Sequence, residues 1–192
     1  MLGERVVLWP LGEAGSVGLG LNRICKREGL WALSLCTRDG LQVCQLSFSF
    51  LQRDRLMIGS VQGAAAQDDR AMQAVRDLTH AAEGLRPPFL LVEVLRALCQ
   101  RQATAMLGVD PQHHVKKRWH QRVLTVSFDY CGFWTALGGQ RGLNGMWALP
   151  AQRPARAVDG VPSKRRAQHR RKLAMLAAMP DQLHALLPPA VR

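Results

Sequence analysis

The sequence predicts an α/β fold (α+β in looser usage) with one mixed, twisted sheet flanked by helices. Residues 30–36, 41–51 and 56–61 are short apolar or alternating runs separated by turn residues, which predicts three consecutive antiparallel strands. Two helical stretches then separate 56–61 from a further apolar strand at 103–109. A crossover of this length is what joins parallel neighbours, so the last two strands are expected to lie side by side.

Composition favours one folded unit with an anionic partner. The 192 residues are 47% hydrophobic and carry 26 Lys and Arg against 14 Asp and Glu, a formal net charge of +12. We expect a poorly defined segment at 1–28 and a single domain at 29–192. The charge favours nucleic acid, anionic lipid head groups or phosphates as partners; the alternative is a basic protein without any of these.

The N-terminal segment has few signals. Residues 6–9 are apolar and predict a short strand that Pro10 ends. The glycines between Gly12 and Gly20 lack the strand-to-helix context of a phosphate-binding loop, so a leading segment that is flexible or truncated is the preferred interpretation.

The cysteines and the hydropathy suggest a location. The five cysteines include no C-x-x-C pair, and Cys36, Cys44 and Cys99 lie among apolar residues, so we predict buried thiols in a reducing compartment. No apolar run approaches the ~20 residues of a membrane span, and no signal peptide is recognisable. The predicted location is the cytoplasm, with a peripheral position at the inner membrane as a variant.

The strand at 41–51 alternates regularly. This period places Leu46, Phe48 and Phe50 on the core face and turns Ser47 and Ser49 towards solvent. Asp39 and Gly40 supply the preceding turn.

Two helices are expected at 71–82 and 89–101. Gly84 ends the first, and Pro88 suits the first turn of the second. Glu93 and Arg96 lie three residues apart and are expected to pair on the exposed side of the second helix. A catalytic carboxylate at Glu93 is the weaker interpretation.

Polar residues follow two neighbouring strands of the predicted sheet. In sheets with parallel strands, ligands favour the carboxyl ends, where this chain has Gln62, Gly63, Asp110, His113 and His114. One histidine is a candidate base, with an ordinary polar loop as the alternative. The sequence predicts no metal site, because no third ligand accompanies the histidines at a known spacing.

The stretch after the histidines is basic. Residues 116–122 hold five basic or histidine side chains around Trp119, a composition that suits stacking on a base or lying along a head group, or simply a solvated face. A strand at 123–128, a short helix after Asp129 and a strand at 146–149 complete the expected sheet.

The last expected helix covers 163–187. Its first part is crowded with cations, and cations in a first turn oppose the helix dipole, which an anion docked there would relieve. A solvated basic face is the alternative. The candidate anion-binding residues are Lys164, Arg165, Arg166, Arg170 and Arg171.

Several short segments of this sequence resemble the bacterial VirK/YbjX family. They are Ile58–Gly63, Leu78-Thr79, Gly84–Pro87, Asp129-Tyr130, Phe133-Trp134, Leu137–Gly139, Leu149-Pro150 and Pro162–Arg166 with Arg170-Arg171. The resemblance implies a link with virulence and with resistance to cationic antimicrobial peptides in Gram-negative bacteria, but no defined activity. Family members usually carry a longer N-terminal part. Four residues within these segments join the strand-end residues as candidate ligand contacts: Thr79, Arg86, Asp129 and Trp134.

The order of expected elements also resembles the acyl-CoA N-acyltransferase (GNAT) arrangement. That resemblance implies coenzyme A or acyl-CoA as the cofactor, with His113 or His114 as base and Tyr130 as acid. The pyrophosphate-binding loop of those enzymes is missing from this sequence. Residues Gln62–Ala66 are only weakly similar to it. Fold analogy alone is a weak guide to function.

Three hypotheses follow. The first is an accessory stress or virulence protein that binds an anionic ligand or lipid surface through the C-terminal basic helix. The second is an acyltransferase with a thioester donor. A nucleic-acid binder ranks third, because no helix-turn-helix, zinc-finger or RNA-recognition signature occurs. A protein partner remains an alternative to all three.

Overall fold

A computed structural model describes residues 5–24, 26–52, 54–64, 68–100, 104–115, 128–142, 145–154 and 162–186. Within these ranges one eight-stranded sheet has the order β1-β2-β3-β4-β5-β6-β8-β7. All neighbours are antiparallel except β5 and β6, which are parallel. The strands are β1 Val6–Pro10, β2 Gly15–Leu21, β3 Trp31–Thr37, β4 Gln42–Gln52, β5 Arg55–Gly63, β6 Ala105–Val109, β7 Gln140–Arg141 and β8 Met146–Leu149.

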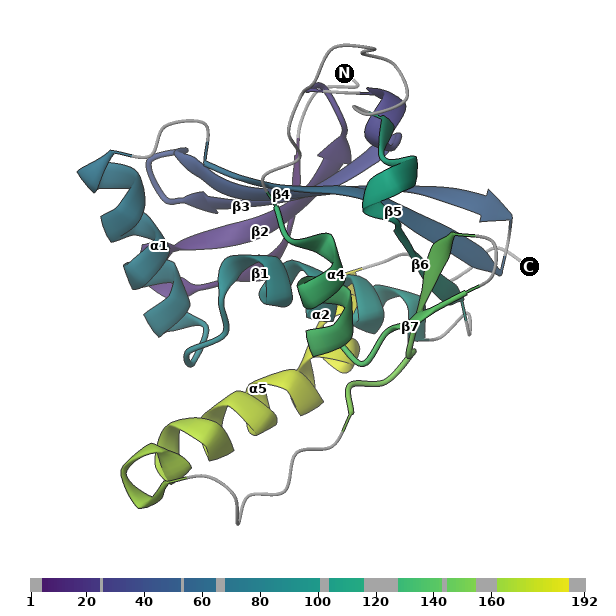
Figure 1. Cartoon of the computed structure of the whole chain (residues 1–192). Helices are drawn as coiled ribbons and strands as arrows, with labels where there is room; N and C mark the ends of the chain where they lie inside the picture. The colour runs from purple at the N-terminus through teal and green to yellow at the C-terminus, as the bar shows by residue number, and fades with distance from the viewer. Residues whose placement is uncertain are drawn as a thin grey trace.

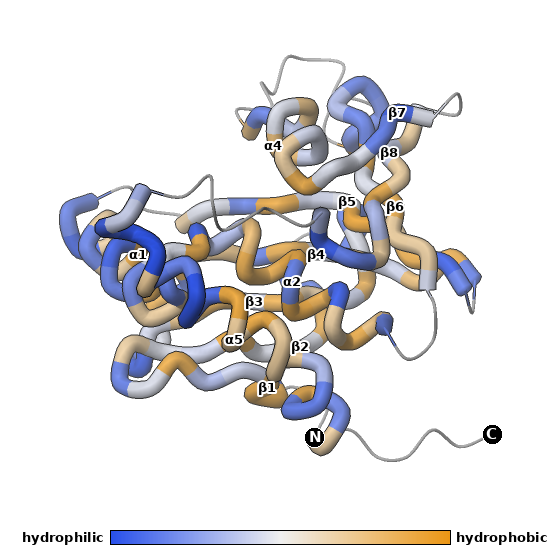
Figure 2. The backbone as a smooth tube through the Cα atoms, turned by 90° about the horizontal axis from the view of Figure 1, so that it is seen from below, coloured by the Kyte–Doolittle hydropathy of each residue, from blue (hydrophilic) through white to orange (hydrophobic). Residues whose placement is uncertain are grey.

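The α-helices pack on one face of this sheet (Figure 1). They are α1 Asp69–Ala81, α2 Pro87–Cys99, α4 Tyr130–Ala136 and α5 Ser163–Leu186. α2 contacts β3 and β4 directly, and α5 packs on α2. α2 is apolar almost throughout, whereas α1 at the periphery is largely hydrophilic (Figure 2). The apolar helix therefore lies between the sheet and the basic helix.

The predicted α/β fold is confirmed. The meander of β3, β4 and β5, the crossover through α1 and α2, and the parallel pairing of β5 with β6 all occur as expected. α4, β8 and α5 also follow the expected ranges closely. The finer acyltransferase-like topology stays a prediction. The expected strand at 123–128 and the basic cluster at 116–122 lie outside the described residues, apart from Phe128.

The preferred interpretation of the glycine-rich N-terminal stretch was wrong, because this stretch forms β2. β2 pairs along its whole length with β3, from Gly15 with Thr37 to Leu21 with Trp31. Gly15 has a φ of 148°, and a Cβ there would lie 2.0 Å from the carbonyl oxygen of Cys36. A glycine is required at this position by close backbone approach rather than by flexibility.

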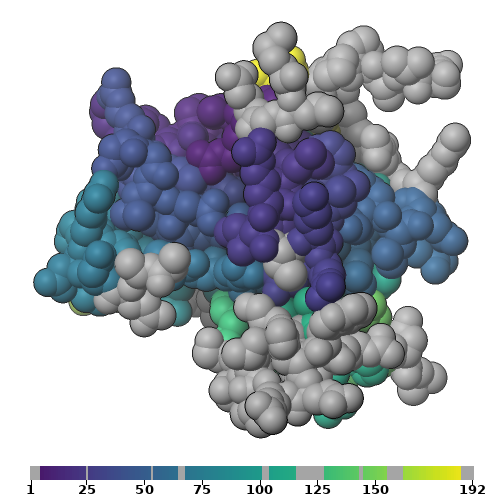
Figure 3. Space-filling view, turned by 90° about the horizontal axis from the view of Figure 1, so that it is seen from above, coloured from purple at the N-terminus to yellow at the C-terminus, as the bar shows by residue number. Residues whose placement is uncertain are grey.

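The prediction that Ser47 and Ser49 face solvent was wrong for Ser47, which is fully buried, whereas Ser49 is half-buried. Residues 22–24 and 26–30, between β2 and β3, lie over the face of the sheet opposite the α-helices; Figure 3 views the molecule from this side. The Asn22 side-chain amide donates to Ser47 Oγ at 3.1 Å and to the Gly29 carbonyl at 2.9 Å. Ser49 Oγ accepts from the Leu30 amide. Both sheet faces are therefore covered here, and alternation no longer separates core from solvent.

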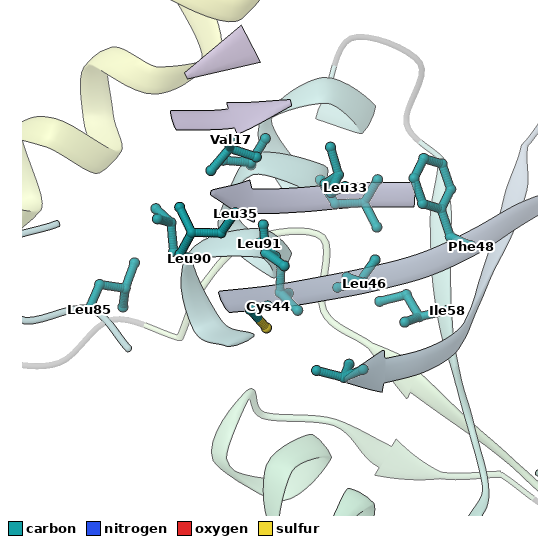
Figure 4. Packing of buried hydrophobic residues seen from close by; sticks show 14 of the residues in the cluster. Val17, Leu33, Leu35, Cys44, Leu46, Phe48, Ile58, Leu85, Leu90 and Leu91 are labelled. Carbon is teal, nitrogen blue, oxygen red and sulfur yellow. The ribbon is translucent and has the colours of Figure 1, made fainter. Parts of the chain in front are cut away.

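The main core lies between the helical layer and the sheet. Leu33, Leu35 and Leu46 of the central strands meet Leu90 and Leu91 of α2, and all five side chains are fully buried (Figure 4). Burial of apolar surface stabilises a fold by roughly 25 cal/mol per Å², so this contact contributes to the stability of the molecule.

The predicted thiols are buried. Cys36, Cys44 and Cys99 are reduced and buried, whereas Cys131 is reduced and exposed. Burial raises the pKa of Cys44 and of Cys99 to about 12, since an apolar environment disfavours the thiolate.

None of the helices in the described ranges is both long enough and apolar enough to cross a membrane.

Candidate functional site

The carboxyl ends of β5 and β6 bring part of the predicted site together. The two strands pair from Arg55 with Ala105 to Ile58 with Gly108. Beyond that point α4 supplies the hydrogen bonds: the Val61 amide donates to the Tyr130 hydroxyl at 3.0 Å, and Trp134 Nε1 donates to the Val109 carbonyl at 2.9 Å. Asp129 caps α4 by accepting from the Gly132 amide, which holds both aromatic residues in place.

His114 and Tyr130, the predicted base and acid, are neighbours. His114 Nε2 lies 3.3 Å from the Tyr130 hydroxyl, and the two residues are 1% and 2% exposed. Burial raises the pKa of Tyr130 to about 12; the hydrogen bond from Val61 lowers it, and the Glu28 carboxylate raises it further. The phenol is therefore protonated at neutral pH. A buried pair bonded to the backbone of β5 is suited to ordering the strand end.

Asp110 has a structural role. Its Oδ1 accepts from the Gln112 amide, and its Oδ2 lies 2.9 Å from Arg141 Nε and 3.3 Å from Trp147 Nε1. Burial raises the pKa of this carboxyl, but the Gln112 amide and Arg141 outweigh it, so the pKa lies below its usual range. This carboxylate joins the turn after β6 to β7 and β8.

The remaining candidates are distributed over several elements. His113 is exposed, and its ring packs closely on Gly145, where an added Cβ would lie 2.3 Å from His113 Cε1. The Gln62 side-chain amide hydrogen-bonds to Glu28, and Gly63 is the exposed last residue of β5. Thr79 lies in α1, and Arg86 directly precedes α2, so both belong to the helical layer. Within the described ranges, no three His, Cys, Asp or Glu side chains are grouped so that they could hold a metal ion.

The basic helix α5 is docked on the molecule, and its cations point in different directions. Met179 and Leu183, near its C-terminus, are buried in the core. Lys164, Arg166 and Arg170 are exposed and lie outside the groove between α5 and α2, whereas Arg165 lines that groove. Arg171 pairs with Glu83 at 3.0 Å, which fastens the N-terminal half of α5 to the end of α1.

The pairing of Glu93 with Arg96 is confirmed at 2.9 Å, but the prediction that the pair is exposed was wrong. The side chains are 9% and 4% exposed, because the end of α4 covers them and Arg96 Nη2 donates to the Leu137 carbonyl. Sequence reasoning missed this buried charge, and it also missed Arg153, which lies 3.7 Å from Glu93. The available signal was the composition of α2, which is apolar on all sides and therefore leaves no solvent face for a charged pair.

These features define the molecule as an α/β protein with a docked basic helix and a buried ion pair beneath it. Residues 2–185 match the family described as "Protein of unknown function (DUF535)", and the chain belongs to this family. The resemblance to VirK/YbjX proteins is confirmed, because Escherichia coli K12 protein YbjX is 26% identical over 178 residues, 90% of this chain and 53% of that protein.

Two further relatives extend the comparison. A Haemophilus influenzae protein is 29% identical over 176 residues, 92% of this chain and 59% of that protein. Membrane protein LapB of Mannheimia haemolytica is 37% identical over 105 residues, 54% of this chain and 43% of that protein. The chain thus spans about half the length of the curated relatives it matches. No solved structure matches it.

Proposed function

We propose that this protein is an accessory protein of the bacterial envelope, active in stress or virulence, that binds an anionic surface through α5. The observation that carries this proposal is the grouping of cations on one docked helix. Lys164, Arg166 and Arg170 are exposed within two turns of each other, and Asp181 is the one acidic residue of α5.

The docking of α5 supports the proposal physically. A helix that is anchored by Met179 and Leu183 and tied down by the Arg171–Glu83 pair holds its cations in a fixed arrangement. Binding then costs less ordering entropy than it would for a flexible basic tail. The cations in the first turn, which oppose the helix dipole, gain further from a nearby anionic surface.

The relatives support an envelope setting. LapB is named as a membrane protein, and the VirK/YbjX resemblance connects the family with virulence and with resistance to cationic antimicrobial peptides. A protein that is peripheral at the inner membrane fits both the basic helix and these names. Phospholipid head groups are the anionic surface that such a protein would meet there.

Vesicle sedimentation tests the proposal. We expect the full chain to bind phosphatidylglycerol vesicles and not phosphatidylcholine vesicles, with an affinity that falls steeply as salt is added. The double variant Lys164→Ala/Arg170→Ala should bind about 20- to 30-fold more weakly, at about 1 kcal/mol per cation.

The matched control is Arg55→Ala/Arg76→Ala, which removes the same charge from exposed positions on β5 and α1. Equal loss in the two double variants would mean that net charge alone drives binding and would reject α5 as the binding surface. If duplex or single-stranded DNA displaced the protein from vesicles at lower concentration than lipid did, a nucleic-acid partner would replace the membrane.

A thioester-using acyltransferase is the second candidate. It rests on one observation, the 3.3 Å contact between His114 Nε2 and the Tyr130 hydroxyl at the end of β5. Calorimetric titration with coenzyme A and acetyl-CoA tests it. Affinity that is lost in His114→Ala but kept in His113→Ala would favour this candidate, and no measurable affinity would reject it.

A further inference from the structure

A groove lies behind the exposed cations, between α5, α2 and residues 151–154. Its volume is about 830 Å³, within the range of sites that hold small molecules. Arg165, His169 and Lys172 line it from α5, Arg96 from α2, and Arg153 from the segment before α5. The three α5 residues follow one another at intervals of four and three, so they share one face of the helix.

The charges in this groove are unbalanced. The Glu93 carboxylate is shared by two guanidinium groups, with Arg96 Nη1 at 2.9 Å and Arg153 Nη1 at 3.7 Å. The Glu93 and Arg96 side chains are more than nine-tenths buried, where water screens charge poorly. Burial lowers the pKa of Arg96, Glu93 raises it, and the like charge of Arg153 lowers it again. Glu83 also lines the groove, but its carboxylate pairs with Arg171 outside it. A further negative charge beside Arg96 and Arg153 would offset the remaining excess.

The groove also contains buried nitrogen atoms that lack a hydrogen-bond partner within the part of the chain that the structure describes. Arg96 Nε, Arg153 Nη1 and His169 Nε2 are buried and have no hydrogen-bond partner among the described residues. A buried polar atom without a partner costs about 1–3 kcal/mol, so protein interiors rarely contain three such atoms near each other. Arg96 and His169 are themselves only 5% and 8% exposed. The groove thus offers fixed nitrogen donors on both of its walls.

We infer that this groove binds an organic phosphate, with the phosphate between Arg96, Arg153 and His169. A phosphate has three or more acceptor oxygens, and guanidinium groups bind it through charge-assisted hydrogen bonds. Its negative charge would offset the positive charge that Glu93 leaves uncompensated at Arg96 and Arg153. The volume far exceeds that of one phosphate, so the ligand carries an organic body. Leu173, Leu176 and Ala177 provide an apolar wall for that body.

This inference does not rest on the proposed function, because the groove residues differ from the exposed cations Lys164, Arg166 and Arg170. The phosphate belongs either to a soluble ester or to a lipid head group. In the second case the apolar wall would contact the lipid chains. One experiment distinguishes these two sources.

Isothermal titration of the full chain with glycerol 3-phosphate and with monomeric dihexanoyl phosphatidic acid tests the inference. We expect at least one probe to bind at one site, and Arg153→Ala and Arg165→Ala each to lower its affinity by about tenfold or more. Arg76→Ala, which removes one exposed charge from α1, is the matched control and should bind like the wild type.

The outcomes separate cleanly. Equal affinity for the two probes would assign a soluble phosphate ester, and tenfold tighter binding of the lipid would assign a head group with its chains along Leu173 and Leu176. Lys164→Ala/Arg170→Ala should keep groove binding even if it loses vesicle binding. No binding of either probe, or equal losses in Arg153→Ala, Arg165→Ala and Arg76→Ala, would overturn the inference.

Discussion

At the scale of single residues, the hydroxyl of Tyr130 links α4 to the end of β5. It accepts from the Val61 amide at 3.0 Å, and burial raises its pKa to about 12 from its usual value of 10.0. Because the folded state holds this proton more tightly, Tyr130 contributes its full stability below pH 10. That contribution is lost as the pH rises from about 10 to about 12.

Tyr130 is the one tyrosine of the chain, so its titration can be observed directly. We expect the tyrosinate absorbance of the folded protein to reach its midpoint near pH 12, and that of the urea-unfolded protein near pH 10. Tyr130→Phe should flatten the loss of unfolding free energy between these pH values, a loss of at most about 2–3 kcal/mol for two pKa units. A folded-state midpoint near 10 would show that the hydroxyl is not buried.

Gly59 lies where the backbone of β5 contacts the backbone at Glu28. A Cβ at this position would be 1.9 Å from the Glu28 carbonyl oxygen, because the short 3-10 helix Lys26–Glu28 contacts β5 from the face opposite the α-helices. We expect Gly59→Ala to lower the free energy of unfolding by about 2–4 kcal/mol, since neither backbone can move without breaking sheet or turn contacts.

Gly63→Ala is the matched control for that change. Gly63 lies on the same strand, and a Cβ there would meet no atom within 4 Å. Urea unfolding of the two variants measures the difference. Similar midpoints for Gly59→Ala and Gly63→Ala would contradict the close packing of Lys26–Glu28 on the sheet.

Single-residue environments were the hardest to predict from sequence. Alternation assigned Leu46 and Phe48 to the core correctly, because one face of β4 meets α2. It was wrong for Phe50, which is 50% exposed near the end of β4. It failed for Ser47, because a polar network of Asn22 and Gln45 covers the other face. A period of two reports which residues share a face and does not report what covers that face.

At the scale of elements, α5 combines an exposed basic half with a buried apolar end. Leu183 is fully buried in the core, whereas Leu186, one turn later, is 57% exposed. We expect Leu183→Ala to lower the free energy of unfolding by about 2–4 kcal/mol and Leu186→Ala to change it by less than about 0.5 kcal/mol. Thermal or urea unfolding gives both values.

The same pair of variants tests whether α5 is docked. If Leu183→Ala were as mild as Leu186→Ala, α5 would be a loosely attached basic tail, and the groove behind it would not be a fixed site. If Leu183→Ala also weakened binding of organic phosphate without unfolding the protein, the position of α5 would be shown to define the groove.

Elements with a strong periodic pattern were predictable, and the glycine-rich strand was not. The segments that became β3, β4 and α2 carry long apolar runs with the correct period, and their boundaries agree within about two residues. β2 reads GSVGLGL, a composition that normally weakens a strand. Gly15 is needed because the backbone of β3 approaches closely, and Gly18 faces the Arg5 side chain; both contacts are set by tertiary structure.

At the scale of the whole molecule, long-range contacts decided what the sequence could show about the sites. The contact between His114 and Tyr130 could be predicted from the sequence, because both residues follow strands that the parallel pairing brings together. The groove was not, since Arg96, Arg153 and His169 come from three segments that no local pattern connects. Buried charge is recognisable only after the covering elements α4 and α5 are placed.

The layered architecture also predicts how stability is distributed. β4 pairs with β3 and β5 on its two sides and packs against α2, so its amides are protected by hydrogen bonds and by burial. β1 pairs only with β2 among the described strands, and Val6 and Val7 are 61% and 53% exposed. Local opening therefore costs much less free energy at β1 than at β4.

Amide hydrogen exchange followed by mass spectrometry measures this distribution. We expect peptides from β3, β4 and α2 to exchange most slowly, at rates set by global unfolding, and peptides from β1 and the two-residue β7 to exchange first. Glycerol 3-phosphate or dihexanoyl phosphatidic acid should slow exchange in α5 and leave β1 unchanged, because α5 lines the groove and Val6 and Val7 of β1 are exposed strand residues outside it. Protection of β1 equal to that of β4 would contradict the sheet order, and ligand protection confined to β5 and β6 would move the binding site to the strand ends.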